Sequence, residues 1–265
     1  MLRGSSLYQL IVQYKQLIAQ NYELVSSAVE TCEFTLEEYQ KAIFLILSRT
    51  FSFQATGARG YANVPVLDML NHSFTPNAQY AYDSAYEGYE LRALRDIAVD
   101  EEITISYGDY QDAQSFFIHY GFLGSNMLPF AISLQPSDPG YQAKAKMLAA
   151  KGQLSRTFKL GPGTEKVPGL IDWLKFLCYD ESIQKDELEA TIWKRLGTMF
   201  QEKLAGLPEE AKEAPIGPNA ENCQAFFKLE RAVFTNMVDK SATMLQYVET
   251  KAVEDLTIWE QFYSA

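Results

Sequence analysis

Hydrophobic positions recur at helical spacing over the first fifty residues. In residues 7–25 an apolar side chain returns every three or four positions, which predicts an amphipathic helix. Thr35 and Glu38 have the spacing of a capping box, so a second helix is predicted to start there and to run to about residues 49–51. Its apolar face carries Tyr39, Ala42, Ile43, Ile46 and Leu47. Residues 52–63 are polar and contain glycine, and are predicted to form a loop.

The pattern changes to short β-like runs between about residues 64 and 134. The first two runs are separated by residues 83–88, which are predicted to form a hairpin loop. A helix is predicted at 111–120, and Gly121 fits a left-handed residue that ends it. The runs that predict strands are residues 78–82, 89–94, 103–106 and 130–134. This part of the chain is therefore expected to mix helices with short strands.

From Pro136 onward the strand signals end. Breaks that contain proline and glycine separate segments with helical spacing of apolar residues, among them residues 188–204 and 227–248. The change in texture near residues 126–140 predicts a boundary between a mixed region and an all-helical one. Apolar stripes in such helices are first of all the core of a helix bundle.

Charge and cysteine content narrow the classes of ligand. With 34 acidic and 23 basic residues the net charge is −11, which repels nucleic acid and suits a basic protein segment, although acidic surfaces also simply keep proteins soluble. Two histidines and three scattered cysteines predict no metal site. No apolar run approaches the roughly 20 residues that span a bilayer, so no membrane partner is expected. The cysteine usage predicts a reducing intracellular compartment: cytoplasm, nucleus or plastid.

Three short motifs in the mixed region contain residues that could carry chemistry. Asn71-His72 ends an apolar run, residues 103–108 form a strand that delivers Tyr107 into a turn, and residues 119–122 read His-Tyr-Gly-Phe. Taken singly, each is more often structural, because a tyrosine at a strand end is usually a half-buried anchor. Two histidines leave too little for a Ser/His/Asp arrangement.

Together, in this order and spacing, the motifs of residues 65–122 resemble the C-terminal half of SET-domain methyltransferases, in the branch of the Rubisco large-subunit lysine methyltransferases. In that branch an NH motif precedes an xYG motif and a YGF follows. Ser48-Arg49-Thr50-Phe51 stands where the family has a helix that ends in SR-x-F. The resemblance implies an α+β fold, with a partial SET domain of short strands and a knot-like crossing at 1–130. Within it, about 1–34 would be a helical insert and about 35–130 the C-terminal half, followed by an all-α substrate-binding domain at 131–265.

The resemblance also implies S-adenosylmethionine as the cofactor and a protein substrate that bears a lysine. Tyr107 would be the catalytic residue. Arg49 would pair with the cofactor carboxylate, a task suited to a forked guanidinium. The implied cofactor-binding residues are Arg49, Asp68, Asn71, His72, Tyr107 and Phe122. Phe51 and Tyr110 would line the channel for the substrate side chain, and Phe51 favours lysine because histidine-methylating relatives carry asparagine at that place.

The Gly-x-Gly strand-turn that opens SET domains of this branch is not found in the sequence. Two interpretations follow: a piece of a longer enzyme, with weak or no activity by itself, or a shortened and inactive relative that only binds proteins. The retained Arg49, Asn71, His72 and Tyr107 favour the first. A purely structural helical domain would explain residues 131–265 but not the motifs of 65–122. The oligomeric state is left open.

Overall fold

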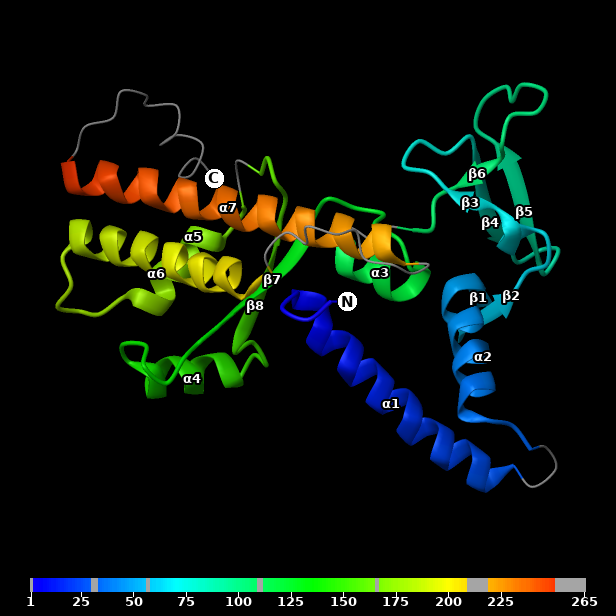
Figure 1. Cartoon of the computed structure of the whole chain (residues 1–265), viewed down its shortest axis with the longest axis horizontal. Coiled ribbons are helices and arrows are strands. Elements are labelled where there is room, and N and C mark those ends of the chain that lie inside the picture. The colour runs from blue at the N-terminus through cyan, green and yellow to red at the C-terminus, as the bar shows by residue number, and fades with distance from the viewer. Residues whose placement is uncertain are drawn as a thin grey trace. The chain divides into compact units, whose positions relative to one another are not determined.

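The computed structural model describes residues 2–29, 33–55, 58–108, 112–164, 167–208 and 219–250. The chain forms two compact units, which are described separately (Figure 1). The helical unit comprises residues 1–9, 112–117 and 121–265, and the mixed unit comprises residues 10–111 and 118–120. The assignment of 1–130 to a SET-type region and of 131–265 to a substrate-binding region stays a prediction.

Both predicted N-terminal helices are present. α1 spans Ser6–Ala28 and α2 spans Leu36–Arg49. The capping box is confirmed: Glu38 N donates to Thr35 Oγ1 at 3.2 Å, and Thr35 N donates to Glu38 Oε2 at 2.8 Å. α2 buries none of its side chains, so its apolar face is at least partly exposed.

The loop predicted at residues 52–63 is instead a hairpin. β1 (Thr50–Ala55) pairs antiparallel with β2 (Ala58–Asn63). Gly60, a residue type that predicted a loop, lies inside β2. This position requires glycine because a Cβ there would overlap the Phe53 ring on the paired strand. That ring lies 5.0 Å from the ring of Tyr82, so the hairpin is held by aromatic packing.

The rest of the mixed unit follows the predicted strands. η1 (Leu67–Met69) leads into β3 (Asn71–His72), which pairs in parallel with β6 (Thr104–Ile105). β4 (Ala78–Asp83) and β5 (Gly88–Ala93) form the predicted hairpin. The buried centre of this unit is formed by Leu67, Ala78 and Ile105. Leu67 and Ile105 come from the segments that carry the NH and xYG motifs, and Ala78 begins β4, so the motifs are anchored in a core.

Among its described residues, the helical unit contains a strand pair as well as helices. α3 (Ala113–Tyr120), which extends into the mixed unit, ends as predicted at Gly121, whose φ is 79°. β7 (Leu128–Ser133) pairs antiparallel with β8 (Ser155–Leu160), so the prediction of an all-helical region after Pro136 is wrong at β8. In β8 only Phe158 and Leu160 are buried, which leaves too weak an apolar pattern to predict a strand.

Long helices complete this unit. α6 and α7 run side by side (Figure 1) and bury large aromatic side chains. The helices are α4 (Tyr141–Ala149), α5 (Leu170–Cys178), α6 (Lys185–Gly206) and α7 (Ala220–Thr250). The predicted helical segments 188–204 and 227–248 fall within α6 and α7. The buried aromatic residues of α6 and α7 are Trp193, Phe200, Phe226 and Phe234.

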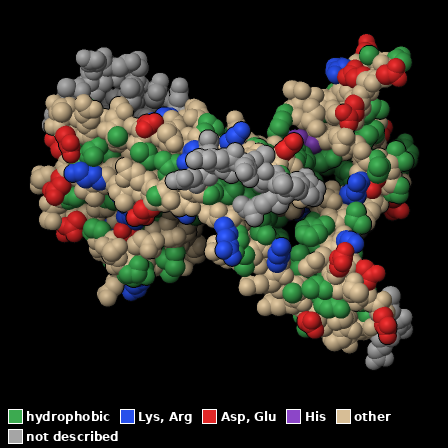
Figure 2. Space-filling view, viewed as in Figure 1, with side chains coloured by type: hydrophobic (Ala, Val, Ile, Leu, Met, Phe, Trp, Pro, Cys, Tyr) green, Lys and Arg blue, Asp and Glu red, His purple; other side chains and the backbone are tan. Residues whose placement is uncertain are grey.

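Charged side chains are scattered over the surface. On the face seen in Figure 2, acidic and basic side chains are interspersed over the described residues. None of the described helices combines the length and the hydropathy that crossing a membrane requires. Within the described ranges, histidine, cysteine and carboxylate side chains do not gather in groups of three or more that could hold a metal ion.

Candidate functional site

The parallel β3–β6 pair joins the NH motif to the xYG motif. Asn71 is paired with Thr104 and His72 with Ile105. Two residues beyond the end of β6, Tyr107 N donates to His72 Nδ1 at 3.2 Å, although the two residues are 35 positions apart. Because an accepting Nδ1 carries no proton, the neutral imidazole must hold its proton on Nε2. Burial lowers the pKa of His72, which agrees with that neutral form.

Tyr107 is fixed at both its hydroxyl and its ring. Its hydroxyl donates to the carbonyl oxygen of Leu70 at 2.8 Å. Its ring lies 4.6 Å from the ring of Tyr120 and packs against the buried cluster that contains Ile105. Burial raises the pKa of Tyr107; nearby Arg49 opposes this and Glu102 adds to it. The residue is therefore a neutral phenol whose proton is already donated and whose oxygen can still accept.

Arg49, the last residue of α2, reaches the stretch that precedes Asn71. Its Nη1 donates to the carbonyl oxygen of Asp68 at 2.7 Å and lies 4.0 Å from Asp68 Oδ2. The Arg49 side chain is 39% exposed. Since a guanidinium has five N–H donors and these contacts engage one nitrogen, Arg49 keeps donors for a bound anion.

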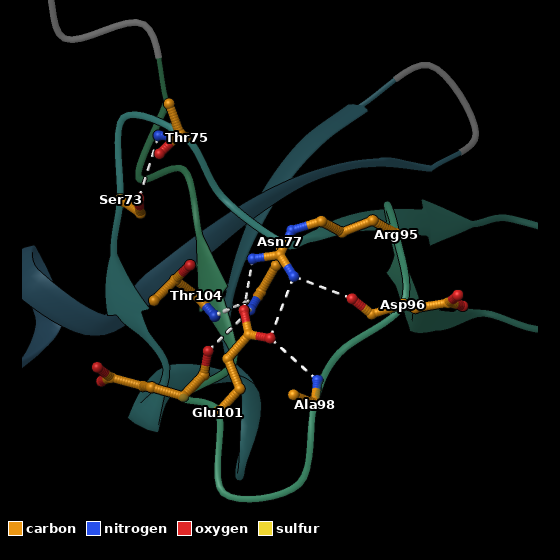
Figure 3. A network of polar contacts seen from close by, with 9 residues as sticks. Ser73, Thr75, Asn77, Arg95, Asp96, Ala98, Glu101 and Thr104 are labelled. Atoms are coloured by element: carbon orange, nitrogen blue, oxygen red, sulfur yellow. Dashed lines mark hydrogen bonds and ion pairs between the residues drawn. The ribbon is translucent and has the colours of Figure 1, made fainter.

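A buried amide holds the loop before β6. Asn77 Nδ2 donates to Glu101 Oε1 at 3.0 Å and to the carbonyl oxygen of Glu102 at 2.8 Å, and its Oδ1 accepts from Thr104 N at 2.8 Å (Figure 3). Arg95 forms an ion pair with Glu101. Glu101 accepts hydrogen bonds from Arg95, from Ala98 N and from Asn77, and these bonds lower the pKa of Glu101 to about 2. The network fixes residues 101–104 and thus the strand that leads to the site.

Glu102 is a site residue that the sequence interpretation missed. Asn71 Nδ2 donates to Glu102 Oε1 at 2.6 Å. In the sequence, Glu102 belongs to an acidic run before a strand, which reads as a charged turn. Glu102 lies two residues before Thr104, and Thr104 pairs with Asn71 in the parallel ladder. This pairing, which the residues around Glu102 do not predict, brings its carboxylate to Asn71.

The other predicted residues fall in three places. Phe51 packs against the same buried cluster as Tyr107, with its ring 4.9 Å from that of Tyr80 in an edge-on arrangement. Phe122 belongs to the helical unit, where its ring lies 5.6 Å from that of Phe116. Tyr110 lies outside the described residues.

Arg49, Asp68, Asn71, His72 and Tyr107 are thus brought together within the mixed unit, linked through residues 68–72. The arrangement offers a cationic donor at one end, an amide beside a carboxylate, and a phenol oxygen that can accept. Such a set can bind a zwitterionic ligand and orient a neutral amine. The individual roles stay predictions.

Comparison with known proteins assigns the fold. The family model described as SET domain matches residues 8–108. Solved structures of SET-domain proteins share the architecture of helices and short strands over nearly the whole chain, as set out below. The predicted SET-type fold is therefore confirmed.

Two solved structures illustrate the likeness. One, the SET domain of LSMT bound to lysine and AdoHcy, has a TM-score of 0.74 and 18% identity, over 94% of this chain and 66% of that chain. Another, Rubisco LSMT bound to AdoMet, has a TM-score of 0.74 and 17% identity, over 98% of this chain and 72% of that chain. SET domain-containing protein 8 of Schizosaccharomyces pombe is 37% identical over 59 residues, which are 22% of this chain and 13% of that protein. The chain thus spans 66% of the first structure and a small part of the curated relative.

Proposed function

We propose that this protein is an S-adenosylmethionine-dependent protein-lysine N-methyltransferase of the SET type. The observation that carries the proposal is the linkage of Arg49, the Asn71–His72 pair and Tyr107 through one short stretch of chain. Two related structures support it, because they are bound to lysine with AdoHcy and to AdoMet. The finer assignment to the Rubisco large-subunit methyltransferase branch belongs to the same proposal.

The side chains present fit this cofactor. S-adenosylmethionine has a carboxylate, an ammonium group and an adenine, and it supplies a methyl group activated by a sulfonium. Arg49 would pair with the carboxylate through its remaining N–H donors. Asn71 and His72 offer polar atoms to the ammonium and adenine ends, and Phe122 is proposed to lie near the adenine. Asp68 contributes through its backbone, whose carbonyl holds Arg49 in place.

Tyr107 would act on the substrate amine by position. Since its proton is donated to Leu70 O, its oxygen presents lone pairs that can accept a hydrogen bond from a neutral amine and align the amine lone pair for in-line attack. A lysine amine has a pKa of about 10.4 in water, and an apolar aromatic channel lowers it by disfavouring the charged form. Phe51 and Tyr110 are proposed as walls of that channel.

The helical region is proposed to hold the protein substrate. The net charge of −11 suits a basic segment around the target lysine. A reducing intracellular compartment fits the described cysteines, Cys178 and Cys223, which are buried and unbridged.

Calorimetry and a transfer assay with matched variants test the proposal. The parental chain is expected to bind S-adenosylhomocysteine and, by itself, to transfer tritiated methyl groups from S-adenosylmethionine to poly-lysine only weakly. Tyr107→Phe is expected to lower transfer by roughly a hundredfold or more, because it removes a positioned oxygen from the reacting centre. Its affinity for S-adenosylhomocysteine should stay within about threefold, because the cofactor carboxylate pairs with Arg49.

Tyr86→Phe is the matched control, since Tyr86 is 85% exposed in the β4–β5 hairpin loop. This variant should transfer methyl groups at the parental rate. Parental transfer by Tyr107→Phe would overturn the catalytic assignment. Absence of heat with S-adenosylhomocysteine would favour the alternative, a catalytically inactive SET-like module that binds proteins. Transfer to a histidine peptide in place of poly-lysine would favour a histidine-directed enzyme.

A further inference from the structure

We propose that Glu102 is a positioning residue that makes the site selective for adenosyl ligands with an amino-acid end. It does so by turning the amide oxygen of Asn71 toward the ligand's ammonium group and by adding a negative charge beside it. The inference rests on the proposed function and extends it to the residue that determines which group of the ligand Asn71 binds.

The chemistry of a carboxylate fixes the orientation of Asn71. An ionised carboxylate has acceptors only, so the group that Asn71 places 2.6 Å from Glu102 Oε1 must be its NH₂ and not its oxygen. An amide with its nitrogen committed in this way presents its oxygen on the other side. That oxygen can accept hydrogen bonds from an ammonium group, which has donors alone.

The position of Glu102 is held from outside the site. Its backbone carbonyl accepts from the buried Asn77, which also donates to the preceding carboxylate in the chain, Glu101. Arg95 neutralises Glu101, and Glu101 also accepts from Ala98 N. The Glu101 carboxylate is thereby engaged in structural contacts. The adjacent carboxylate, that of Glu102, is exposed and accepts the hydrogen bond from Asn71.

The acidic side of the site complements the charge pattern of the cofactor. Arg49, which is bonded to Asp68, provides the positive charge that pairs with the ligand's carboxylate. Glu102, which is bonded to Asn71, provides the negative charge that pairs with the ligand's ammonium group. An adenosyl ligand that lacks the amino-acid end would lose both partners. Ligands of the two kinds should therefore respond differently when Glu102 is changed.

Isothermal titration with three ligands on the full chain tests this inference. The ligands are S-adenosylhomocysteine, its decarboxylated amine, and 5′-methylthioadenosine, which lacks the amino-acid end. Glu102→Gln removes the charge and keeps an acceptor, and is expected to weaken the first two ligands roughly threefold. Glu102→Met removes charge and acceptor together, and is expected to weaken them roughly tenfold or more. Binding of 5′-methylthioadenosine should stay within about twofold in both variants, because it has no ammonium group.

Glu37→Gln is the matched control, since Glu37 is an exposed carboxylate of the same unit, paired with Lys41 on α2. It should leave the affinities for all three ligands at parental values. Equal weakening of S-adenosylhomocysteine and 5′-methylthioadenosine by Glu102→Met would show a merely structural role and overturn the inference. Unchanged binding of S-adenosylhomocysteine would overturn it as well, while the proposed function would stand. A parental chain that binds none of the ligands would overturn the proposed function and this inference with it.

Discussion

Replacing Asn77 with alanine is expected to destabilise the mixed unit by about 2–4 kcal/mol. Asn77 is 2% exposed, and its amide makes hydrogen bonds at 3.0, 2.8 and 2.8 Å to Glu101, Glu102 and Thr104. Each such bond contributes about 0.5–1.5 kcal/mol net, and one to an ionised carboxylate contributes about 1.5–3 kcal/mol. Alanine also leaves Thr104 N and Glu102 O without these partners, so the loss should be greater than for a typical surface change.

Hydrogen–deuterium exchange with mass spectrometry can read this effect in one unit at a time. Peptides that cover residues 94–108 report on the loop that Asn77 holds, and peptides from α6 in the helical unit serve as an internal reference. In Asn77→Ala the first set should exchange at least tenfold faster, since about 1.4 kcal/mol is a factor of ten in the opening equilibrium. The α6 peptides should keep parental rates.

Asn63→Ala is the comparison variant, because Asn63 is exposed and accepts one side-chain bond, from Thr50 Oγ1 at 3.1 Å. Its effect should stay within about 0.5 kcal/mol. Parental exchange of residues 94–108 in Asn77→Ala would refute the reasoning, because it would mean that the buried amide does not hold the strand leading to Tyr107. Faster exchange in α6 would equally contradict it, since the effect would then be global.

Two further perturbations test packing and charge. Gly124→Ala should lower the stability by about 1–3 kcal/mol in thermal unfolding, because a Cβ there would overlap the fully buried Phe116 ring, whereas Gly163→Ala, in open space, should be near neutral. For Glu101, held at a pKa of about 2 chiefly by Arg95, the folded pKa lies below the unfolded value of about 4.3. The stability that the parent gains over Glu101→Gln should therefore be complete above about pH 4.3 and fade as the pH falls toward 2. Urea unfolding at several pH values measures this, and a gap independent of pH would contradict it.

Features that depend on neighbouring residues were predictable from the sequence. The capping box at Thr35 and the left-handed end of α3 at Gly121 need only side chains within a few positions of each other. The β4–β5 hairpin was predicted because two short β-like runs lie on either side of a turn segment at residues 83–88. The hairpin at residues 50–63 was not predicted, because glycine is required at position 60 by the Phe53 ring on the opposite strand and not by its sequence neighbours.

The candidate site divides in the same way. The order and spacing of the motifs identified Arg49, the Asn71–His72 pair and Tyr107. This resemblance predicts that the residues lie close together but gives no physical reason for it. Glu102 was missed because its meaning depends on a partner 31 positions away, and nothing local separates it from Glu101 beside it. Only the parallel register of β3 and β6 shows which of the two carboxylates meets Asn71.

The two sides of the site differ in stiffness. His72 pairs with the fully buried Ile105 across the β3–β6 ladder, and Tyr107 follows β6, so local opening of either residue requires disruption of the core. Arg49 ends a helix that buries no side chain and is held by its capping box and by its bond to Asp68. The phenol oxygen therefore keeps a fixed place, whereas the guanidinium can shift at a smaller energetic cost.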